Sequence, residues 1–197
     1  LCKPGKSGRT PAELRPIALL EPTGKAVMGL LAHRLFHSVS SRLLRLPQLA
    51  YLPLRGSDEA ICRVRKHCSD VRDMLHLLRF DIHRAANDTP GPDAAGGLLL
   101  SLDLTKAFDS VLRSKLFHAL ESLGADSQTL DMLRHIYEHT SFSFWHRGQS
   151  RTLPTHRGIR QGCKAAPILW SCFAAWILET AAATNGWAWL HEALTAY

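Results

Sequence analysis

Apolar residues recur at helical spacing in the first part of the chain and predict two long helices. The first helix is expected over residues 24–46, where Pro47 stops it, and the second over residues 57–80. We expect one buried stripe on each helix, formed in the first by Val27, Leu30, Leu31, Leu35, Val39 and Leu43, and in the second by Ile61, Val64, Val71, Leu75 and Leu78.

The pattern changes after residues 87–97, which are rich in Asn, Pro and Gly and predict a loop. A short buried strand is expected next, formed by Leu98, Leu99, Leu100 and Leu102. Two helices should follow, one stopped at Gly124 and one carrying Leu130, Leu133, Ile136 and Tyr137. Aromatic and serine residues then alternate up to a hairpin turn near Arg147, and a last helix is expected from Pro167 to about Thr184. The predicted fold is α+β, with helices packed on a small antiparallel sheet.

A carboxylate stands at the end of the predicted strand. Asp103 follows Leu102 directly, at the point where a rigid sheet would end and a cleft begin. Two-metal nucleotidyl transfer needs a fixed carboxylate of this kind, although an aspartate at a strand end also commonly caps a turn or a helix. Asp109, six residues further on, is interpreted as a helix cap.

A second polar segment lies downstream, in a turn flanked by two glycines. Gly158 and Gly162 permit backbone conformations that other residues resist. Gln161 brings an amide that both donates and accepts hydrogen bonds. Pro167 suits the first turn of the apolar helix that follows.

Residues 100–109 and 158–170, in this order and at this separation, resemble motifs A and B of the reverse transcriptase palm of non-LTR (LINE-like) retrotransposons. Two further segments resemble the same family: residues 14–20, which contain Arg-Pro-Ile, and residues 48–57. Together the four segments span most of the chain. The resemblance therefore implies an RNA-directed DNA polymerase.

The resemblance also implies a fold, a partial polymerase right hand. Residues 1–97 would form the fingers and the fingers–palm region, residues 98–197 would form the palm, and the thumb would be absent. For this chain the resemblance implies three partners, an RNA template, a DNA primer and deoxynucleoside triphosphates. The cofactor it implies is Mg²⁺, with two ions in the complete enzyme. Mn²⁺ is the alternative ion. The oligomeric state stays open.

Individual roles follow from the matched motif positions. Asp103 would be the catalytic carboxylate and would bind metal together with the backbone carbonyl of Leu104. Phe108 would contact the sugar and exclude a ribose 2′-hydroxyl, with core packing as the alternative. The residues expected to bind the incoming nucleotide are Arg15, Lys106, Ala107, Phe108, Gln161 and Gly162, and those expected to contact nucleic acid are Arg55, Arg157 and Arg160.

The charge of the chain agrees with a polyanionic partner. Its 197 residues include 24 Lys and Arg against 17 Asp and Glu, which gives a net charge of +7 at pH 7. Four arginines, Arg147, Arg151, Arg157 and Arg160, gather just before Gln161. Nucleic-acid contact is the favoured interpretation of this group, and a solvated surface is the alternative.

The five cysteines form no Cys-x-x-Cys pair, which argues against a secreted disulfide framework. We therefore expect an intracellular protein, in the nucleus or the cytoplasm. Cys62, His67 and Cys68 lack a fourth zinc ligand at the usual spacing and are expected to pack in the core. The apolar run over residues 165–178 is too short to span a membrane, so no membrane partner is predicted.

The end of the sequence departs from the family pattern. A reverse transcriptase needs paired aspartates in a Tyr/Phe-Ala-Asp-Asp turn, and none follows Gly162. Residues 194–197 resemble the strand entering that turn, so we expect a fragment cut just before Ala-Asp-Asp and inactive alone, because one carboxylate cannot hold two ions. Two alternatives stay open. One is a catalytically dead, basic nucleic-acid-binding remnant, and the other is a group II intron-type or RNA-templated RNA polymerase palm.

Overall fold

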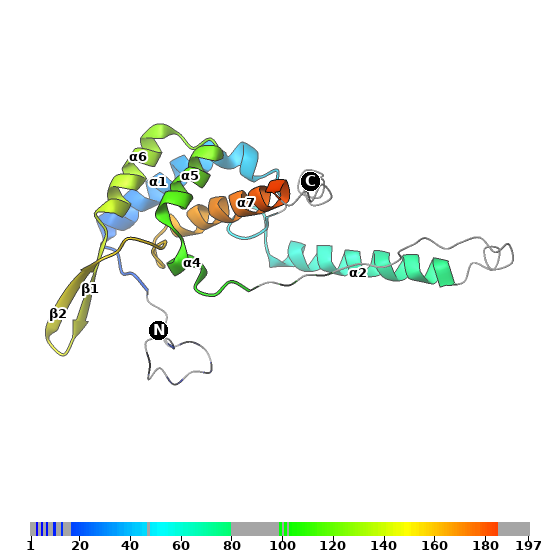
Figure 1. Ribbon diagram of the computed structural model, residues 1–197, viewed down its shortest axis with the longest axis horizontal. Helices are drawn as coiled ribbons and strands as arrows, with labels where there is room; N and C mark the ends of the chain where they lie inside the picture. The colour runs from blue at the N-terminus through cyan, green and yellow to red at the C-terminus, as the bar shows by residue number, and fades with distance from the viewer. Residues whose placement is uncertain are drawn as a thin grey trace. The chain divides into compact units, whose positions relative to one another are not determined.

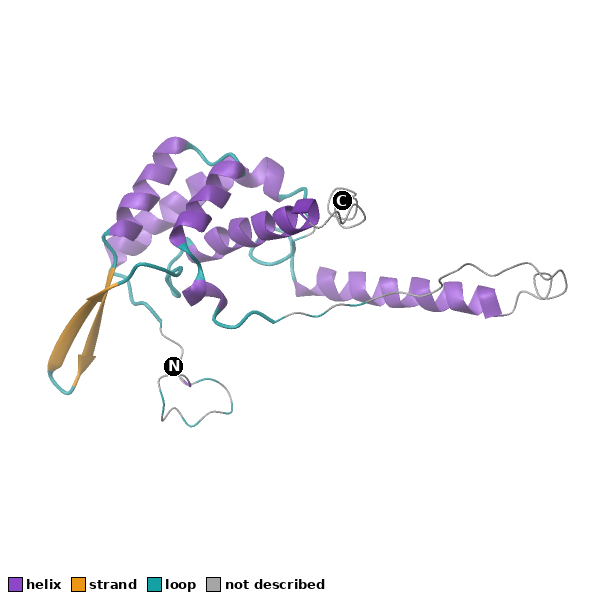
Figure 2. Cartoon of the chain, in the orientation of Figure 1, coloured by secondary structure: helices purple, strands orange, loops and turns teal. Residues whose placement is uncertain are grey.

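The computed structural model describes residues 3, 5, 7, 10, 13, 17–46, 48–79, 99, 101 and 103–184 (Figure 1). The chain divides into two compact units, one formed by Leu1–Leu52 with Thr105–Tyr197 and the other by Pro53–Leu104. The described part is mainly helical and contains one antiparallel hairpin (Figure 2). The first unit holds α1 (Pro22–Leu43), α4 (Ala107–Ser110), α5 (Arg113–Ser122), α6 (Ser127–Glu138), β1 (Ser141–His146), β2 (Gln149–Pro154) and α7 (Ala166–Thr184), and the second holds α2 (Ser57–Arg79).

Helix α1 confirms the first predicted helix, although it ends at Leu43, before the predicted stop at Pro47. It begins with Pro22, whose fixed φ suits a first helical turn. Its buried face is the stripe Met28, Leu31, Leu35, Val39 and Leu43. Val27 and Leu30 are exposed, so their predicted burial is wrong. Helices α6 and α7 pack on α1, and apolar residues outside the covered stripe stay in water.

Helices α5, α6 and α7 complete the core of this unit. Helix α5 packs against both α6 and α7. It ends near Gly124 as predicted, where a φ of +86° suits the residue that follows a helix. The Asp126 carboxylate caps α6 by accepting a hydrogen bond of 2.9 Å from the Thr129 N–H, and this bond lowers the pKa of Asp126. The two helices predicted after Asp109 are thus confirmed.

Helix α7 confirms the last predicted helix. Among the described residues, it is the one helix long and apolar enough to cross a membrane by length and composition. Its buried residues include Leu169, Cys172 and Ala175, which belong to the same hydrophobic core as α1 and α5. Ser171 donates a hydrogen bond of 3.2 Å to the Ala50 carbonyl. These contacts are those of a core helix.

Strands β1 and β2 confirm the predicted hairpin and its turn. Arg147 and Gly148 connect them with φ values of +48° and +77°, as a tight two-residue hairpin turn requires. The α+β class holds in the sense of helices plus a small two-stranded antiparallel sheet. The expected packing of helices on this sheet is wrong, because all six residues of β2 are exposed. The described helices of this unit bury their apolar faces mainly against one another.

Helix α2 confirms the second predicted helix to within one residue. Its predicted buried stripe is wrong at Ile61, Val64 and Leu75, which are exposed. Cys62 and Cys68 are exposed as well, so they do not pack in a core. Apart from α2, the described part of this unit forms no second layer that could cover these side chains.

The strand predicted before Asp103 is not found at its described residues. Leu99 lies outside any strand with 63% of its surface exposed, and Ser101 also lies outside a strand. The other leucines of this prediction, Leu98, Leu100 and Leu102, lie outside the described residues, as does the predicted loop over residues 87–97.

Candidate active site

The segment that resembles motif A enters the first unit through an unusual backbone conformation. Lys106 has a φ of +53° and a ψ of +41° and precedes the single-turn helix α4. This left-handed residue is exposed, whereas Ala107, Phe108 and Asp109 are half-buried. Val111 follows the helix and is buried in the core. The left-handed conformation of Lys106 therefore lies where the chain turns from the exposed residues 103–106 toward the buried Val111.

Two backbone hydrogen bonds join this segment to the turn that resembles motif B. The Gly158 N–H donates to the Val111 carbonyl and the Ile159 N–H donates to the Phe108 carbonyl, each at 2.8 Å. Gly158 has a φ of +86°, and a Cβ placed on it would lie 3.0 Å from the Asp109 carbonyl oxygen. The close approach of the two backbones therefore requires glycine at this position.

A side-chain hydrogen bond adds to this contact. The Gln161 amide nitrogen donates to Oδ1 of Asp109 at 3.0 Å. The interpretation of Asp109 as a helix cap is wrong, because Lys106 occupies the N-cap position of α4 and Asp109 is the third residue of that helix. From there its carboxylate reaches the Gln161 turn and orients the amide.

The same turn also binds Ala18, the residue that follows the Arg-Pro-Ile sequence of residues 15–17. The Ala18 N–H donates to the Gln161 carbonyl at 2.8 Å. Gly162 has a φ of +97°, and a Cβ placed on it would lie 2.6 Å from the Ala18 carbonyl oxygen. Three segments that are distant in sequence, residues 17–18, 106–111 and 158–163, thus meet at one place. We call this the three-segment junction.

The ring of Phe108 is fixed from one side by Trp170 of α7. The two rings stack with centroids 5.2 Å apart and an angle of 28° between their planes. Both residues are half-buried and pack against the core. Phe108 therefore packs against the core in part, as the alternative interpretation expected. The stacking on Trp170 also restricts where its ring can lie. Sequence reasoning missed Trp170, since nothing in the local pattern distinguishes it from the other apolar residues of α7.

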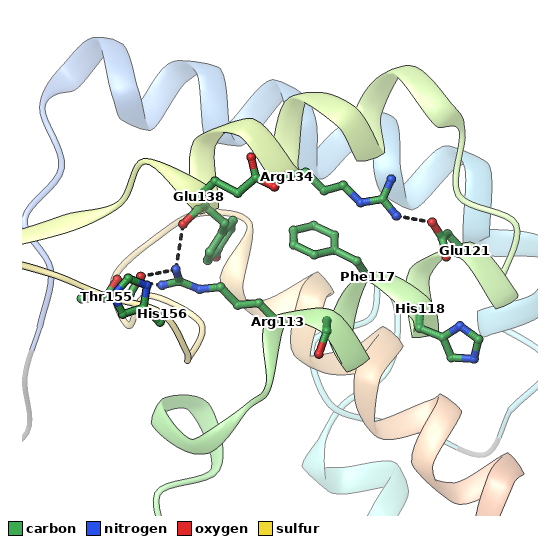
Figure 3. Close-up of a pocket in the computed structure, with 10 residues that line it drawn as sticks. Arg113, Phe117, His118, Glu121, Arg134, Glu138, Thr155 and His156 are labelled. Carbon is green, nitrogen blue, oxygen red and sulfur yellow. Dashed lines mark hydrogen bonds and ion pairs between the residues drawn. The ribbon is translucent and has the colours of Figure 1, made fainter.

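Sequence reasoning also missed Arg113, which braces the junction from the side of α5 (Figure 3). Its guanidinium donates to the carbonyls of Tyr137, Thr155, Gly158 and Arg157 and to the Thr155 hydroxyl. One rigid fork thereby ties α6, the end of the hairpin and the start of the turn together. Burial lowers the pKa of Arg113, and the nearby charge of Arg160 acts in the same direction.

A cleft of about 530 Å³ lies beside Arg113, between α5, α6 and the end of β2. Two of its charged residues, Arg134 and Glu121, form an ion pair across it. The Arg160 guanidinium lies 5.3 Å from the centre of the Tyr137 ring, and Arg113 lies 5.1 Å from the same ring. Burial raises the pKa of the Tyr137 hydroxyl to about 12, and the two arginines partly oppose this rise. Arg113 and Arg160 thus both lie against the buried Tyr137 ring, and Arg134 is paired with Glu121.

The other predicted site residues lie outside the described residues, belong to the second unit, or directly precede the motif B turn. Arg15 lies outside the described residues. Arg55, Asp103 and Leu104 belong to the second unit, in which Asp103 and Leu104 are exposed and Arg55 is half-buried. Arg157 is exposed, and its carbonyl accepts the hydrogen bond from Arg113.

A two-metal site is not formed by the described residues alone. Within residues 17–46, 48–79 and 103–184, no three His, Cys, Asp or Glu side chains gather closely enough to hold a metal ion. Asp109 is engaged by Gln161, and a single carboxylate such as Asp103 cannot hold two divalent ions. The described residues therefore do not fit a two-metal centre by themselves.

The junction joins the two segments that resemble motifs A and B, and comparison with known proteins agrees with the family resemblance. The family model for reverse transcriptase (RNA-dependent DNA polymerase) matches residues 3–191, so the chain belongs to this family. Members of the family act on a nucleic-acid template and primer with nucleotide substrates, generally with Mg²⁺.

A relative places the chain among non-LTR retrotransposons. It is 24% identical over 175 residues to the retrovirus-related Pol polyprotein from type-2 retrotransposable element R2DM of Drosophila melanogaster. The alignment covers 88% of this chain and 14% of that polyprotein, so the chain spans about one seventh of its length. The chain is a reverse transcriptase domain of a non-LTR element. No solved structure matches it significantly.

Proposed function

We propose that this chain supplies part of the active site of an RNA-directed DNA polymerase, which adds deoxynucleotides to a primer 3′-hydroxyl along an RNA template. The observation that carries the proposal is the three-segment junction, in which Phe108 and Gln161 belong to segments joined by backbone hydrogen bonds. Within this proposal, residues 1–97 correspond to the fingers and the fingers–palm region and residues 98–197 to the palm.

The junction supports a nucleotide-binding role for the residues around it. We assign the sugar to Phe108, whose ring is fixed by Trp170 and whose bulk would collide with a 2′-hydroxyl. The backbone N–H groups of Lys106 and Ala107 are assigned to the triphosphate, together with Arg15. Gln161 and Gly162 are assigned to the side of the site facing the nucleotide and template, where Asp109 orients the Gln161 amide.

Metal and nucleic-acid contacts complete the proposal. Asp103 and the Leu104 carbonyl are assigned to Mg²⁺, whose chemistry in this reaction is to neutralise triphosphate charge. The remaining metal ligands must come from outside the described residues. Arg55, Arg157 and Arg160 are assigned to the template and primer strands.

The test is primer extension on an RNA template. The protein assayed is the product of the longest open reading frame that encodes these residues. We expect Asp103→Asn to lower the rate by about 10³-fold or more, because a fixed metal ligand contributes several kcal/mol to transition-state stabilisation. Asp73→Asn is the matched control, since Asp73 is an exposed aspartate on α2. Extension by the Asp103→Asn protein at the rate of the control would refute the assignment of Asp103.

Phe108 offers a second readout of the same proposal. Phe108→Ala should allow ribonucleotides to be added, because it removes the ring next to the sugar. Phe173→Ala is the control, because Phe173 is another half-buried aromatic residue, which packs against Trp170 from within α7. Unchanged discrimination between deoxy- and ribonucleotides in Phe108→Ala would leave Phe108 with a packing role alone.

A second candidate function is nucleic-acid binding without catalysis. It is favoured by residues 139–178, which contain four arginines and one lysine but no aspartate or glutamate. A protein of this kind would bind RNA or DNA with an affinity that falls steeply as salt rises. The protein encoded by the complete reading frame would also show no primer extension.

A further inference from the structure

We propose that one face of the β1–β2 hairpin binds single-stranded nucleic acid, with bases stacked on Phe142 and Phe144 and a phosphate held by Arg151. This surface is separate from the three-segment junction. The proposal does not depend on polymerase activity, because it concerns binding in the absence of nucleotides and Mg²⁺.

The register of the hairpin places an aromatic and a cationic side chain next to each other. Phe144 lies directly opposite Arg151, and Phe142 lies opposite Leu153. Because side chains alternate between the two faces of a strand, these four residues share one face. The rings of Phe142 and Phe144 have centroids 6.3 Å apart and planes inclined by 40°. We call this the Phe144 face.

The Phe144 face is open to solvent. Phe144 is 54% exposed and Leu153 is 48% exposed, while Phe142 is half-buried. The hairpin extends away from the helices of its unit (Figure 1), so no described helix covers β2. Aromatic rings left in water on a sheet face are a surface on which nucleic-acid bases stack in several RNA-binding modules.

Charge identifies the partner as an anion. The hairpin carries Arg147 at its turn and Arg151 on the Phe144 face, and no acidic residue occurs between Glu138 and Glu179. A ligand that is anionic and also presents flat aromatic groups is a nucleic-acid strand. It must be single-stranded, because the bases of a duplex are already stacked on one another.

The opposite face of the hairpin provides an internal control. It carries Trp145, which is 78% exposed and lies opposite Ser150. Its other residues include Ser143 and Thr152, whose hydroxyl oxygens are hydrogen bonded at 2.8 Å. This face holds an exposed aromatic ring without a cation across from it, so it lacks the combination found on the Phe144 face.

The test measures binding of the full chain to a labelled oligouridine of about twelve nucleotides by fluorescence anisotropy, without Mg²⁺ or nucleotides. We expect Phe144→Ala to raise the Kd about tenfold, as the loss of one stacked base does. Phe144→Tyr should retain the affinity. Arg151→Ala should weaken binding and reduce the slope of log K against log salt by about 0.7. Trp145→Ser should change the Kd by less than about twofold, and circular dichroism should show that all variants are folded.

Four results would overturn the proposal. In the first, Phe144→Ala binds the oligonucleotide as the wild type does. In the second, Trp145→Ser weakens binding as much as Phe144→Ala. In the third, Phe144→Ala weakens binding of a blunt RNA duplex of the same length equally. In the fourth, sedimentation shows that Phe144→Ala dissociates an oligomer, which would make this face an interface between copies of the chain. Failure of primer extension, by contrast, would leave the proposal standing.

Discussion

Gly158 gives the sharpest test of how the motif A and motif B segments are held together. Its φ is +86°, and a Cβ added to it would meet three backbone atoms of Asp109 at 3.0, 3.2 and 3.3 Å. Gly124, after α5, has the same φ of +86° but no heavy atom within 4 Å of such a Cβ. Alanine at either position therefore carries the same free-energy cost of a left-handed backbone. The two variants differ only in the close approach of the added Cβ to Asp109 at residue 158.

The expected losses follow from these two contributions. An alanine in the left-handed region costs about 1 kcal/mol relative to glycine, and this cost applies to both variants. At Gly158 the turn must also move away from α4. That movement weakens the Gly158–Val111 and Ile159–Phe108 hydrogen bonds, each contributing about 1 kcal/mol. We expect a loss in unfolding free energy of about 1 kcal/mol for Gly124→Ala and about 3 kcal/mol for Gly158→Ala.

Urea unfolding followed by far-UV circular dichroism measures this difference. With a slope of about 2 kcal/mol per molar urea, a difference of 2 kcal/mol separates the two midpoints by about 1 M. Equal midpoints for Gly158→Ala and Gly124→Ala would refute the reasoning. The close packing of the turn on Asp109 would then contribute nothing measurable, and glycine would be needed at residue 158 for its φ alone.

Two further predictions concern single groups near the junction. In a double-mutant cycle of Gln161→Ala and Asp109→Ala, the coupling energy should be about 1–2 kcal/mol, because the amide donates to a charged carboxylate; additive losses in urea unfolding would contradict this. The raised pKa of Tyr137, about 12 against an ordinary value of 10, means that its stabilising contribution is complete below pH 10 and is lost as the pH rises toward 12. Above pH 10 the stability of wild type should therefore fall relative to Tyr137→Phe by about 1 kcal/mol per pH unit, and parallel urea-unfolding profiles would argue against it.

The elements that could be predicted from sequence are those fixed by neighbouring residues. The hairpin turn follows from Arg147 and Gly148, whose positive φ values a tight turn requires. The end of α5 follows from Gly124, and the start of α1 lies near Pro22 for a similar local reason. Helical periodicity also predicted α2 over residues 57–80 and a helix that carries Leu130 and Tyr137, which is α6. In each case the signal spans a few residues.

The contacts that escaped prediction join residues distant in sequence. Asp109 and Gln161 are 52 residues apart, and Arg113 lies 45 residues from Gly158. Periodicity shows that a position is apolar or polar, but it does not show which element will cover it. For the same reason, it marked Val27 and Leu30 as buried, although they are exposed. The motif positions indicated Gln161 and Phe108, but their contacts with Asp109 and Trp170 depend on the tertiary fold.

The three-segment junction has a consequence for the order in which the chain folds. The β1–β2 hairpin needs the closure of a two-residue turn alone, which takes microseconds. The junction must instead bring together Ala18, Asp109 and Gln161, so the entropy lost in closing the long chain segments between them opposes its formation. During synthesis from the N-terminus, α1, α5 and α6 can form as they emerge. The junction cannot close until residues 158–163 have left the ribosome, so we expect it to assemble on helices that have already formed.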